Sequence, residues 1–296
     1  MVLNVRVMNL PTFATLTYPA PNYPVLNIQH PACDLQLALH GAHVLGWTPA
    51  GHAPVLYLSP LAVFEHGQPI RGGIPVCWPW FSHHPDDASK PFHGFVRILP
   101  WKLIACEDEG ACVAIRLALC ATDATKALWP HEFEAVIEIR AGAELNVALV
   151  THNSGSAPRL EGGALHTYLQ VGDITQVSIS GLDGAAYRDA TTQGSRHVQD
   201  GVLLIDREID RRYEPHADVI VLDPSLGRQL VVHQQGAEVA VVWNPWINKS
   251  LTLGDLPNED YHHFVCVEAA NPNEQAVTVA PRGTHILRTR IGVQHI

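Results

Sequence analysis

Charged residues and helical periodicity are both scarce in this chain of 296 residues. Asp, Glu, Lys and Arg make up only 16% of it, whereas apolar residues make up 47%. A composition this poor in charge excludes a long solvated tail and supplies enough apolar side chain for a substantial core. Lys and Arg number 19 against 29 Asp and Glu, so the formal net charge is −10. This balance argues against a nucleic-acid partner, although a few arginines in a cleft can still bind a small phosphorylated ligand.

Long apolar runs and paired cysteines are also missing. No segment approaches the roughly 20 apolar residues of a membrane span, so we expect no membrane partner. The first 13 residues lack the apolar stretch of a signal peptide, and we therefore expect a cytoplasmic protein. Six cysteines occur without a C-x-x-C pair, which excludes a zinc ribbon or a thioredoxin motif. Their apolar surroundings predict reduced core residues.

Short strand patterns fill the chain instead. Alternating or wholly apolar runs predict strands over 25–28, 35–39, 112–119, 133–139, 145–150, 175–179, 202–205, 219–222, 229–233, 239–243, 263–268, 276–280 and 285–290. Ala141-Gly142 and Gln235-Gly236 predict hairpins between the strands on either side of them. The 22 Gly and 22 Pro are spread along the whole length. This pattern is typical of an all-β sandwich or barrel, and we expect one antiparallel domain over residues 1–296.

The first segment with chemical character lies between residues 69 and 103. It contains Arg71 before two glycines, and later His93-Gly94-Phe95-Val96-Arg97. Glycines beside a charged residue let the backbone approach a ligand closely. Arginines in so apolar a segment need partners. The tryptophans of this segment either stack on a sugar ring or belong to the core, and the sequence leaves both open: Trp78, Trp80 and Trp101.

Two further segments carry groups suited to proton transfer. His166 follows two glycines and precedes an expected strand, and Glu268 ends the apolar run Phe264-Val265-Cys266-Val267. In a strand, Glu268 shares a face with Phe264 and Cys266. If that face is buried, the pKa of the carboxylate is raised. A structural ion pair is the competing interpretation for such a glutamate.

Taken together, these segments resemble the glucose-6-phosphate 1-epimerases, within the wider aldose 1-epimerase or galactose mutarotase-like superfamily. The resemblance rests on the motifs IRGGIPVCWPWF, HGFVR, LHTY, EIDR, VWNPW and FVCVE, which follow one another in the expected order at 70–81, 93–97, 165–168, 208–211, 242–246 and 264–268. It implies an antiparallel β-supersandwich. It also implies that the enzyme interconverts the α and β anomers of a hexose 6-phosphate, with glucose 6-phosphate as the expected substrate.

The resemblance further assigns roles to individual residues. His166 falls on the general acid of the family and Glu268 on its general base. The substrate-binding positions correspond to Arg71, Arg97 and Asp210, and we expect His93 to face the sugar as well. Relatives often carry Gln before the His-Gly pair, where this chain has Phe92, and this puts the phosphate specificity in question.

Mutarotation needs two proton movements and no redox chemistry, so we expect no cofactor and no metal. The 18 histidines do not form a zinc-protease motif, and no P-loop or dinucleotide-binding motif is present. Two alternatives stay open. One is a mutarotase for unphosphorylated aldoses, and the other is a non-catalytic sugar-binding or regulatory protein on the same fold. We expect a monomer whose partner is a small hexose phosphate.

Overall fold

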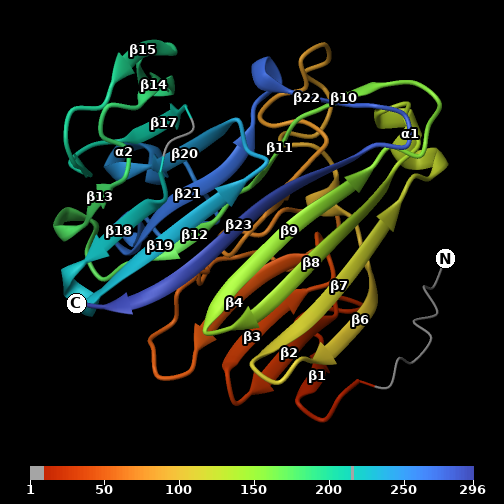
Figure 1. Cartoon of the computed structure of the whole chain (residues 1–296), viewed down its shortest axis with the longest axis horizontal. Coiled ribbons are helices and arrows are strands. Elements are labelled where there is room, and N and C mark those ends of the chain that lie inside the picture. The colour runs from red at the N-terminus through yellow and green to blue at the C-terminus, as the bar shows by residue number, and fades with distance from the viewer. Residues whose placement is uncertain (1–9, 215–216) are drawn as a thin grey trace.

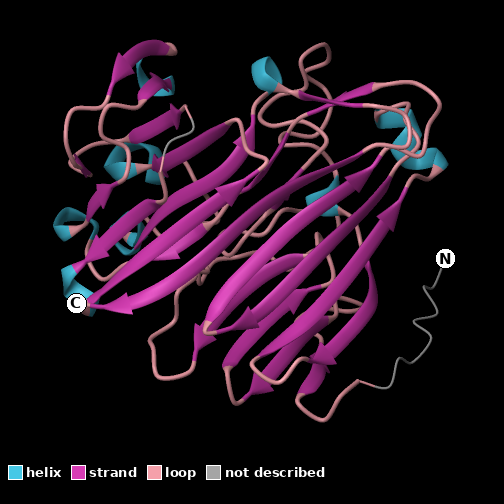
Figure 2. Ribbon diagram, viewed as in Figure 1, coloured by secondary structure: helices cyan, strands magenta, loops and turns pink. Residues whose placement is uncertain are grey.

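The computed structural model describes residues 10–214 and 217–296, and these residues form sheets joined by loops and a few short helices (Figures 1 and 2). The N-terminal residues 1–9, which carry most of the segment without a signal-peptide pattern, lie outside the described residues. Every pair of named strands is antiparallel, as expected. In the described part of the chain, no helix is long and apolar enough to cross a membrane.

The largest sheet has nine strands and forms one layer. Its spatial order is β16 (Leu203–Leu204), β13 (Ser178–Ser180), β18 (Val219–Asp223), β19 (Arg228–Gln235), β23 (Thr284–His295), β9 (Glu144–His152), β8 (Glu134–Gly142), β7 (Cys112–Cys120) and β6 (Lys102–Asp108). Alternation explains its two faces. In β8, for example, Ala135, Ile137 and Ile139 are buried, whereas Glu134 on the same strand is exposed.

A second sheet of eight strands carries the candidate site. Its order is β15 (Ser195–Val198), β14 (Ala186–Asp189), β17 (Ile209–Tyr213), β20 (Val239–Asn244), β21 (Phe264–Asn271), β11 (Gly163–Leu165) and β5 (Val76–Cys77), and β12 (Tyr168–Gln170) also pairs with β21. A four-stranded sheet contains β1 (Ala14–Thr17), β2 (Val25–His30), β3 (Cys33–Ala38) and β4 (His43–Pro49). A two-stranded sheet pairs β10 (Arg159–Glu161) with β22 (Val277–Val279).

The four-stranded and eight-stranded sheets together form the layer that faces the nine-stranded sheet. Strands β3 and β4 contact β8, and β21 contacts β19 and β23. An isolated bridge between Val44 of β4 and Ile74, two residues before β5, links the four-stranded sheet to the eight-stranded sheet. One main hydrophobic core fills the space between the layers and includes Leu35, Ile115, Val232 and Val265. The fold is the antiparallel β-supersandwich that the resemblance implied.

Helices are few and short, as the sequence indicated. The α-helices are α1 (Asp123–Leu128) and α2 (Trp246–Ser250), and the short 3-10 turns are Val96–Ile98, Ile174–Gln176, Ala190–Thr192, Pro224–Leu226, Asp260–His263 and Asn273–Gln275. The expected strand over 175–179 is therefore wrong in its first half. There, the Asp173 carboxylate accepts from the backbone N–H of Thr175 and caps a 3-10 turn in place of a strand.

The hairpin predicted at Ala141-Gly142 exists, since β8 pairs with β9. The hairpin predicted around Gln235-Gly236 is wrong. Its two strands belong to different layers, because β19 pairs with β18 and β23, whereas β20 pairs with β17 and β21. A turn signal specifies that the chain reverses, and it does not specify which sheet the next strand joins. Gly236 has φ +72°, and a Cβ there would lie 2.0 Å from the Ile286 carbonyl oxygen.

The prediction for the cysteines is confirmed in part. All six are free, and four of them are buried: Cys33, Cys77, Cys106 and Cys266. Cys112 is half-buried and Cys120 is exposed, so the prediction of core burial is wrong for these two. Both are terminal residues of β7 and lie beyond the residues that pair with β6, so alternation no longer fixes their burial.

Candidate active site

The face of the eight-stranded sheet that points away from the main core carries the candidate site. Arg212 on β17 pairs in register with Val241 on β20, and Val241 pairs with Glu268 on β21. Residues directly opposite one another in a sheet share a face, so these three side chains lie in one row. The alternate positions Val242 and Val267 belong to the main core. The same strands thus serve the core on one face and the site on the other.

His166 lies in the gap between β11 and β12, opposite Glu268. Both short strands pair with β21 in one constant register, with Leu165 opposite Ala269 and Tyr168 opposite Cys266. Counting through the gap places His166 opposite Glu268. Its backbone N–H donates to the Pro75 carbonyl instead of to β21. The local break in the ladder therefore leaves the histidine facing the carboxylate.

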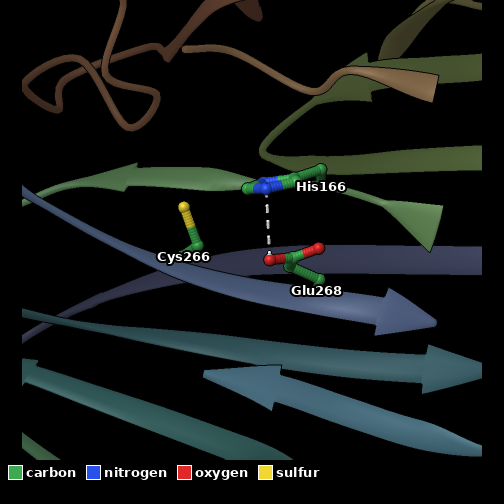
Figure 3. A group of neighbouring side chains, drawn as sticks. All are labelled: His166, Cys266 and Glu268. Carbon is green, nitrogen blue, oxygen red and sulfur yellow. Dashed lines mark ion pairs between the residues drawn. The ribbon is translucent and has the colours of Figure 1, made fainter. Parts of the chain in front are cut away.

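His166 and Glu268 form a close buried pair. The distance from His166 Nε2 to Glu268 Oε1 is 3.4 Å, and the two side chains are 12% and 2% exposed (Figure 3). Among the described residues, Glu268 Oε2 has no hydrogen-bond partner. An unpartnered carboxylate oxygen in a buried position costs stability. This cost argues against the interpretation of Glu268 as a purely structural ion-pair residue.

The surroundings of the pair disfavour charge on both partners. Burial raises the pKa of Glu268 well above its usual value, the nearby carboxylate of Asp210 raises it further, and Arg212 opposes the rise. Burial lowers the pKa of His166 to about 3, and the positive charges of Arg71 and Arg97 add to this effect. An imidazolium–carboxylate pair and an imidazole–carboxylic acid pair hold the same number of protons. Both shifts favour the second, uncharged form.

Arg71 is tied to the histidine through Tyr168. Its NH1 group donates to the Tyr168 hydroxyl at 3.0 Å, and its Nε donates to Asp255 Oδ1 at 3.1 Å. The Tyr168 ring stacks on the His166 ring, with the centroids 4.8 Å apart and 11° between the planes. Tyr168 and His166 are two residues apart and project from the same face of the sheet.

The glycines beside Arg71 serve chain packing. Gly72 has φ +105°, and a Cβ on it would lie 2.5 Å from the Tyr57 carbonyl oxygen. Gly73 has φ +62°, and its Cβ would lie 2.1 Å from the Val44 carbonyl oxygen. The two glycines therefore let this segment pack closely against Tyr57 and β4. That packing fixes the backbone position from which the Arg71 side chain extends.

Arg97 and His93 also lie near His166. The Arg97 NH2 group donates to the Phe92 carbonyl at 2.8 Å, so the residue in the place of the usual Gln holds the arginine through its backbone. His93 is buried, and its Nδ1 accepts from the Ser82 backbone N–H at 3.0 Å. Its ring centroid is 6.0 Å from that of His166. Burial and the charge of Arg97 lower the pKa of His93, which keeps its imidazole neutral.

Asp210 is the sixth predicted residue, and it lies on the same face two strands from Glu268. It pairs in register with Trp243, which in turn pairs with Cys266. Burial raises the pKa of Asp210, and Arg212 opposes the rise. The structure therefore places all six predicted residues around one site: Arg71, His93, Arg97, His166, Asp210 and Glu268.

Sequence reasoning missed several groups. Arg212 follows Asp210 at the alternate position of one strand, and that spacing was the available signal. Trp243 is half-buried, and its ring meets the His166 ring edge-on at 5.9 Å and 83°. The tryptophans considered for sugar stacking are in fact core residues, each 2–3% exposed: Trp78, Trp80 and Trp101. Asp255 comes from a loop 184 residues away from Arg71, and no sequence pattern marks it.

Cys266 adds a thiol to the pair, and a metal ion could in principle bind all three residues. The ligand atoms of His166, Cys266 and Glu268 lie within 4.8 Å of one another. A metal-binding cysteine acts as a thiolate. Burial and the charge of Glu268 raise the pKa of the Cys266 thiol well above its usual value, which keeps the proton on sulfur. This donor set is a poor fit for a cation, and the absence of a catalytic metal stays a prediction.

Comparison with known proteins places the chain in a family. The sequence pattern of the aldose 1-epimerase family matches residues 24–292. The chain belongs to the aldose 1-epimerase family. Membership makes it an epimerase, an enzyme of the isomerase class, whose substrate is a small sugar. The family recognised from the motifs is thereby confirmed.

Individual relatives are similar to this chain in sequence and in structure. A protein of Escherichia coli K12, provisionally named glucose-6-phosphate 1-epimerase, is 36% identical over 264 residues, which is 88% of each chain. The crystal structure of a provisionally named mutarotase from Salmonella typhimurium has a TM-score of 0.91 at 31% identity and covers 98% of this chain and 96% of its own. A galactose mutarotase-like protein from Clostridium acetobutylicum shares the fold, with a TM-score of 0.73 at 11% identity, over 97% of this chain and all of its own.

Proposed function

We propose that this epimerase interconverts the α and β anomers of a hexose 6-phosphate, with glucose 6-phosphate as the first substrate to test. The close buried pair of His166 and Glu268 is the observation that carries this proposal. The names of the relatives from Escherichia coli and Salmonella typhimurium support the substrate. The placement of Arg71 and Arg97 near the pair supports a phosphate group on it.

The reaction begins with two proton movements at one carbon of the sugar. Glu268 removes the proton from the anomeric hydroxyl O1, and His166, as an imidazolium, gives a proton to the ring oxygen O5. The bond between C1 and O5 breaks and leaves an open-chain aldehyde. Rotation about the C1–C2 bond presents the other face of the carbonyl, and the reverse proton movements close the ring on that face.

The geometry of the pair suits this chemistry. O1 and O5 are both bonded to C1, so an acid and a base that serve them at the same time must lie close together. His166 Nε2 and Glu268 Oε1 are 3.4 Å apart. A catalytic group must come within about 2.6–3.2 Å of the atom that exchanges its proton, and two neighbouring oxygens can meet that requirement here. Each group contributes about 10²–10⁴-fold to the rate.

The remaining residues hold the substrate. Arg71 and Arg97 bind the phosphate, because the guanidinium fork matches phosphate oxygens. Asp210 accepts hydrogen bonds from sugar hydroxyls, and the neutral His93 contacts the sugar. Trp243 offers an apolar ring beside His166. We also propose that the chain acts as one domain, a view supported by the single main core shared by the three larger sheets.

Anomer-exchange NMR spectroscopy tests the function directly. Purified enzyme should speed the exchange between the two anomers of glucose 6-phosphate, with free glucose as the control substrate. Acceleration of the phosphate ester alone supports the full proposal. A lack of acceleration for any hexose 6-phosphate would refute it. Arg71→Met and Arg97→Met should each raise KM for the phosphate ester more than they change exchange of free glucose.

A mutarotase for unphosphorylated aldoses is the second candidate, and one contact favours it. The carboxylate of Asp255 already pairs with Arg71, which reduces the positive charge available to a phosphate. In that case free glucose and glucose 6-phosphate should be exchanged with similar kcat/KM. The same NMR measurement decides between the two candidates.

A further inference from the structure

The catalytic pair presents a difficulty for the proposed chemistry. The general acid must be an imidazolium and the general base a carboxylate. In the structure, burial disfavours both charges, and Arg71 and Arg97 further disfavour a charge on His166. The surroundings of the substrate-free pair therefore favour the proton on Glu268, and this is the wrong form for removing a proton from O1.

The two arginines act on one member of the pair. Their charges lower the pKa of His166, whereas the charges that act on Glu268 come from Asp210 and Arg212. The titratable and charged groups that face His166 from the surrounding elements are Arg71, Arg97, His43, His93, Tyr168, Cys266 and Glu268. Among these, the two arginines are the groups whose positive charge disfavours a charged His166. An anion bound by these arginines would offset the two positive charges that add to the effect of burial on His166.

A direct line of contacts joins Arg71 to the pair. The Arg71 NH1 group donates to the Tyr168 hydroxyl at 3.0 Å, the Tyr168 ring stacks on His166 at 4.8 Å, and His166 Nε2 faces Glu268 Oε1 at 3.4 Å. Tyr168 is 2% exposed and also packs against Trp243 and Phe264. Its position is therefore fixed by its neighbours, and it holds the guanidinium at a set place relative to the histidine.

We propose that an oxyanion bound by Arg71 and Arg97 switches the catalytic pair into its working form, by moving the shared proton from Glu268 Oε1 to His166 Nε2. The O–H bond of the carboxylic acid breaks, an N–H bond forms on the imidazole, and no other reactant takes part. Tyr168 is a positioning residue in this step. The inference rests on the proposed function, because it assigns the phosphate of the substrate to the two arginines.

In this role, the phosphate of the substrate contributes to binding and also activates the catalytic pair. Neutralising a positive charge one side chain away changes the proton affinity of His166 by about one to two pKa units at an effective dielectric constant of about 20. The population of the working pair then rises about 10- to 100-fold. A substrate without the phosphate binds a site whose acid and base are in the wrong forms, and so it loses kcat as well as affinity.

Splitting the substrate into two pieces tests the idea. D-xylose is glucose without C6, and phosphite dianion supplies the missing anion. Enzyme-catalysed exchange of xylose anomers, corrected for exchange caused by phosphite alone, should rise about 10- to 100-fold as phosphite saturates. Phosphite that competes with glucose 6-phosphate but leaves xylose exchange unchanged would overturn the inference. Phosphite that does not bind would overturn it as well.

The failures of the two proposals can be told apart. If glucose 6-phosphate exchange is not accelerated, the proposed function fails. If it is accelerated while phosphite has no effect on xylose, the function stands and the switch fails. Infrared difference spectra give a second readout, because phosphite should remove the C=O band of one protonated carboxyl group. Glu268→Gln should lack this change, and a band that persists in the saturated wild-type enzyme would contradict the proton transfer.

Tyr168→Phe tests the link between the two sites. It keeps the ring that stacks on His166 and removes the hydroxyl that accepts from Arg71. We expect phosphite activation to fall about tenfold and the pH profile of xylose exchange to shift, while the fold is retained. Tyr57→Phe is the matched control, since it removes a tyrosine hydroxyl that donates to Asp260 at 2.7 Å and does not accept from an arginine. Equal activation in both variants would show that Tyr168 has no positioning role.

Discussion

Replacing Glu268 with Gln should lower activity and raise stability together. The change keeps the size of the side chain and removes the base, so kcat for anomer exchange should fall about 10²–10⁴-fold. Stability responds in the opposite direction. The pKa of Glu268 is raised in the folded protein, so the native state holds a proton that the unfolded state has already released above its ordinary pKa.

The size of this effect follows from linkage. Over each pH unit between the unfolded and folded pKa values of Glu268, the wild-type protein loses about 1.4 kcal/mol of unfolding free energy relative to the variant. Urea unfolding should therefore show a gain for Glu268→Gln that is about 1–3 kcal/mol larger at pH 7 than at pH 5. His166, whose pKa is lowered, makes stability rise with pH in both proteins and largely cancels in the difference.

A second buried glutamate provides the matched control. Glu161 Oε1 lies 3.5 Å from His285 Nδ1, and the carboxylate accepts from Arg159 at 2.8 Å and from Thr151. These contacts hold the pKa of its carboxyl below the usual value despite burial. Its stabilising contribution is present at neutral pH and is lost as the pH falls through the folded pKa. Glu161→Gln should cost about 3–5 kcal/mol at pH 7 and leave kcat close to wild type. If Glu268→Gln destabilises the protein as Glu161→Gln does, Glu268 is a structural ion-pair residue and our reasoning is wrong.

Three further predictions follow from the surroundings of the pair. Asp255→Asn leaves Arg71 Nε an oxygen acceptor but removes the negative charge that offsets the guanidinium, so KM for glucose 6-phosphate should fall about tenfold with little change for free glucose, and an unchanged KM in steady-state exchange assays would contradict phosphate binding by Arg71. Gly73→Ala places a Cβ 2.1 Å from the Val44 carbonyl oxygen at φ +62°, so urea unfolding should show a loss of more than about 2 kcal/mol, and a near-neutral change would mean that the segment can shift. Arg212→Met removes the cation that lowers the pKa of Glu268. Activity is lost at high pH when His166 and Glu268 give up their single shared proton. The alkaline limb of the kcat/KM profile should therefore move to higher pH in the variant. A limb that stays in place would show that the charge of Arg212 does not act on Glu268.

The sequence predicted the fold class well because strand periodicity is a local property. The β8–β9 hairpin follows from alternation on both sides of a glycine-containing turn. The pairing of β19 and β20 was wrong because the choice of sheet depends on distant partners such as β23, which lies more than 50 residues further along the chain. Local pattern fixes where strands occur, and only the packed layers fix which strands are neighbours.

The residues of the candidate site also fall into those that local sequence patterns can find and those that they cannot. Periodicity placed Glu268 on a face with Cys266, and the same reasoning applied to His166 would have found Tyr168 two residues later. Arg71 and Arg97 were marked by their charge in an apolar segment, and the family motifs supplied their expected role in substrate binding. Asp255 could not be found, because a loop carboxylate carries no local signal. The roles of all these residues, the monomeric state and the cellular compartment stay predictions.

The two-faced strands at the site also bear on how this enzyme can change its substrate. Along β20 and β21, residues such as Val242 and Val267 belong to the main core, while their immediate neighbours Trp243, Cys266 and Glu268 lie on the opposite face, which carries the candidate site. Evolution, or a mutant library, can therefore vary every second position of these strands and leave the packing between the layers untouched. A library restricted to Trp243 and Cys266 would sample new sugar preferences on a scaffold whose folding is set by the alternate residues.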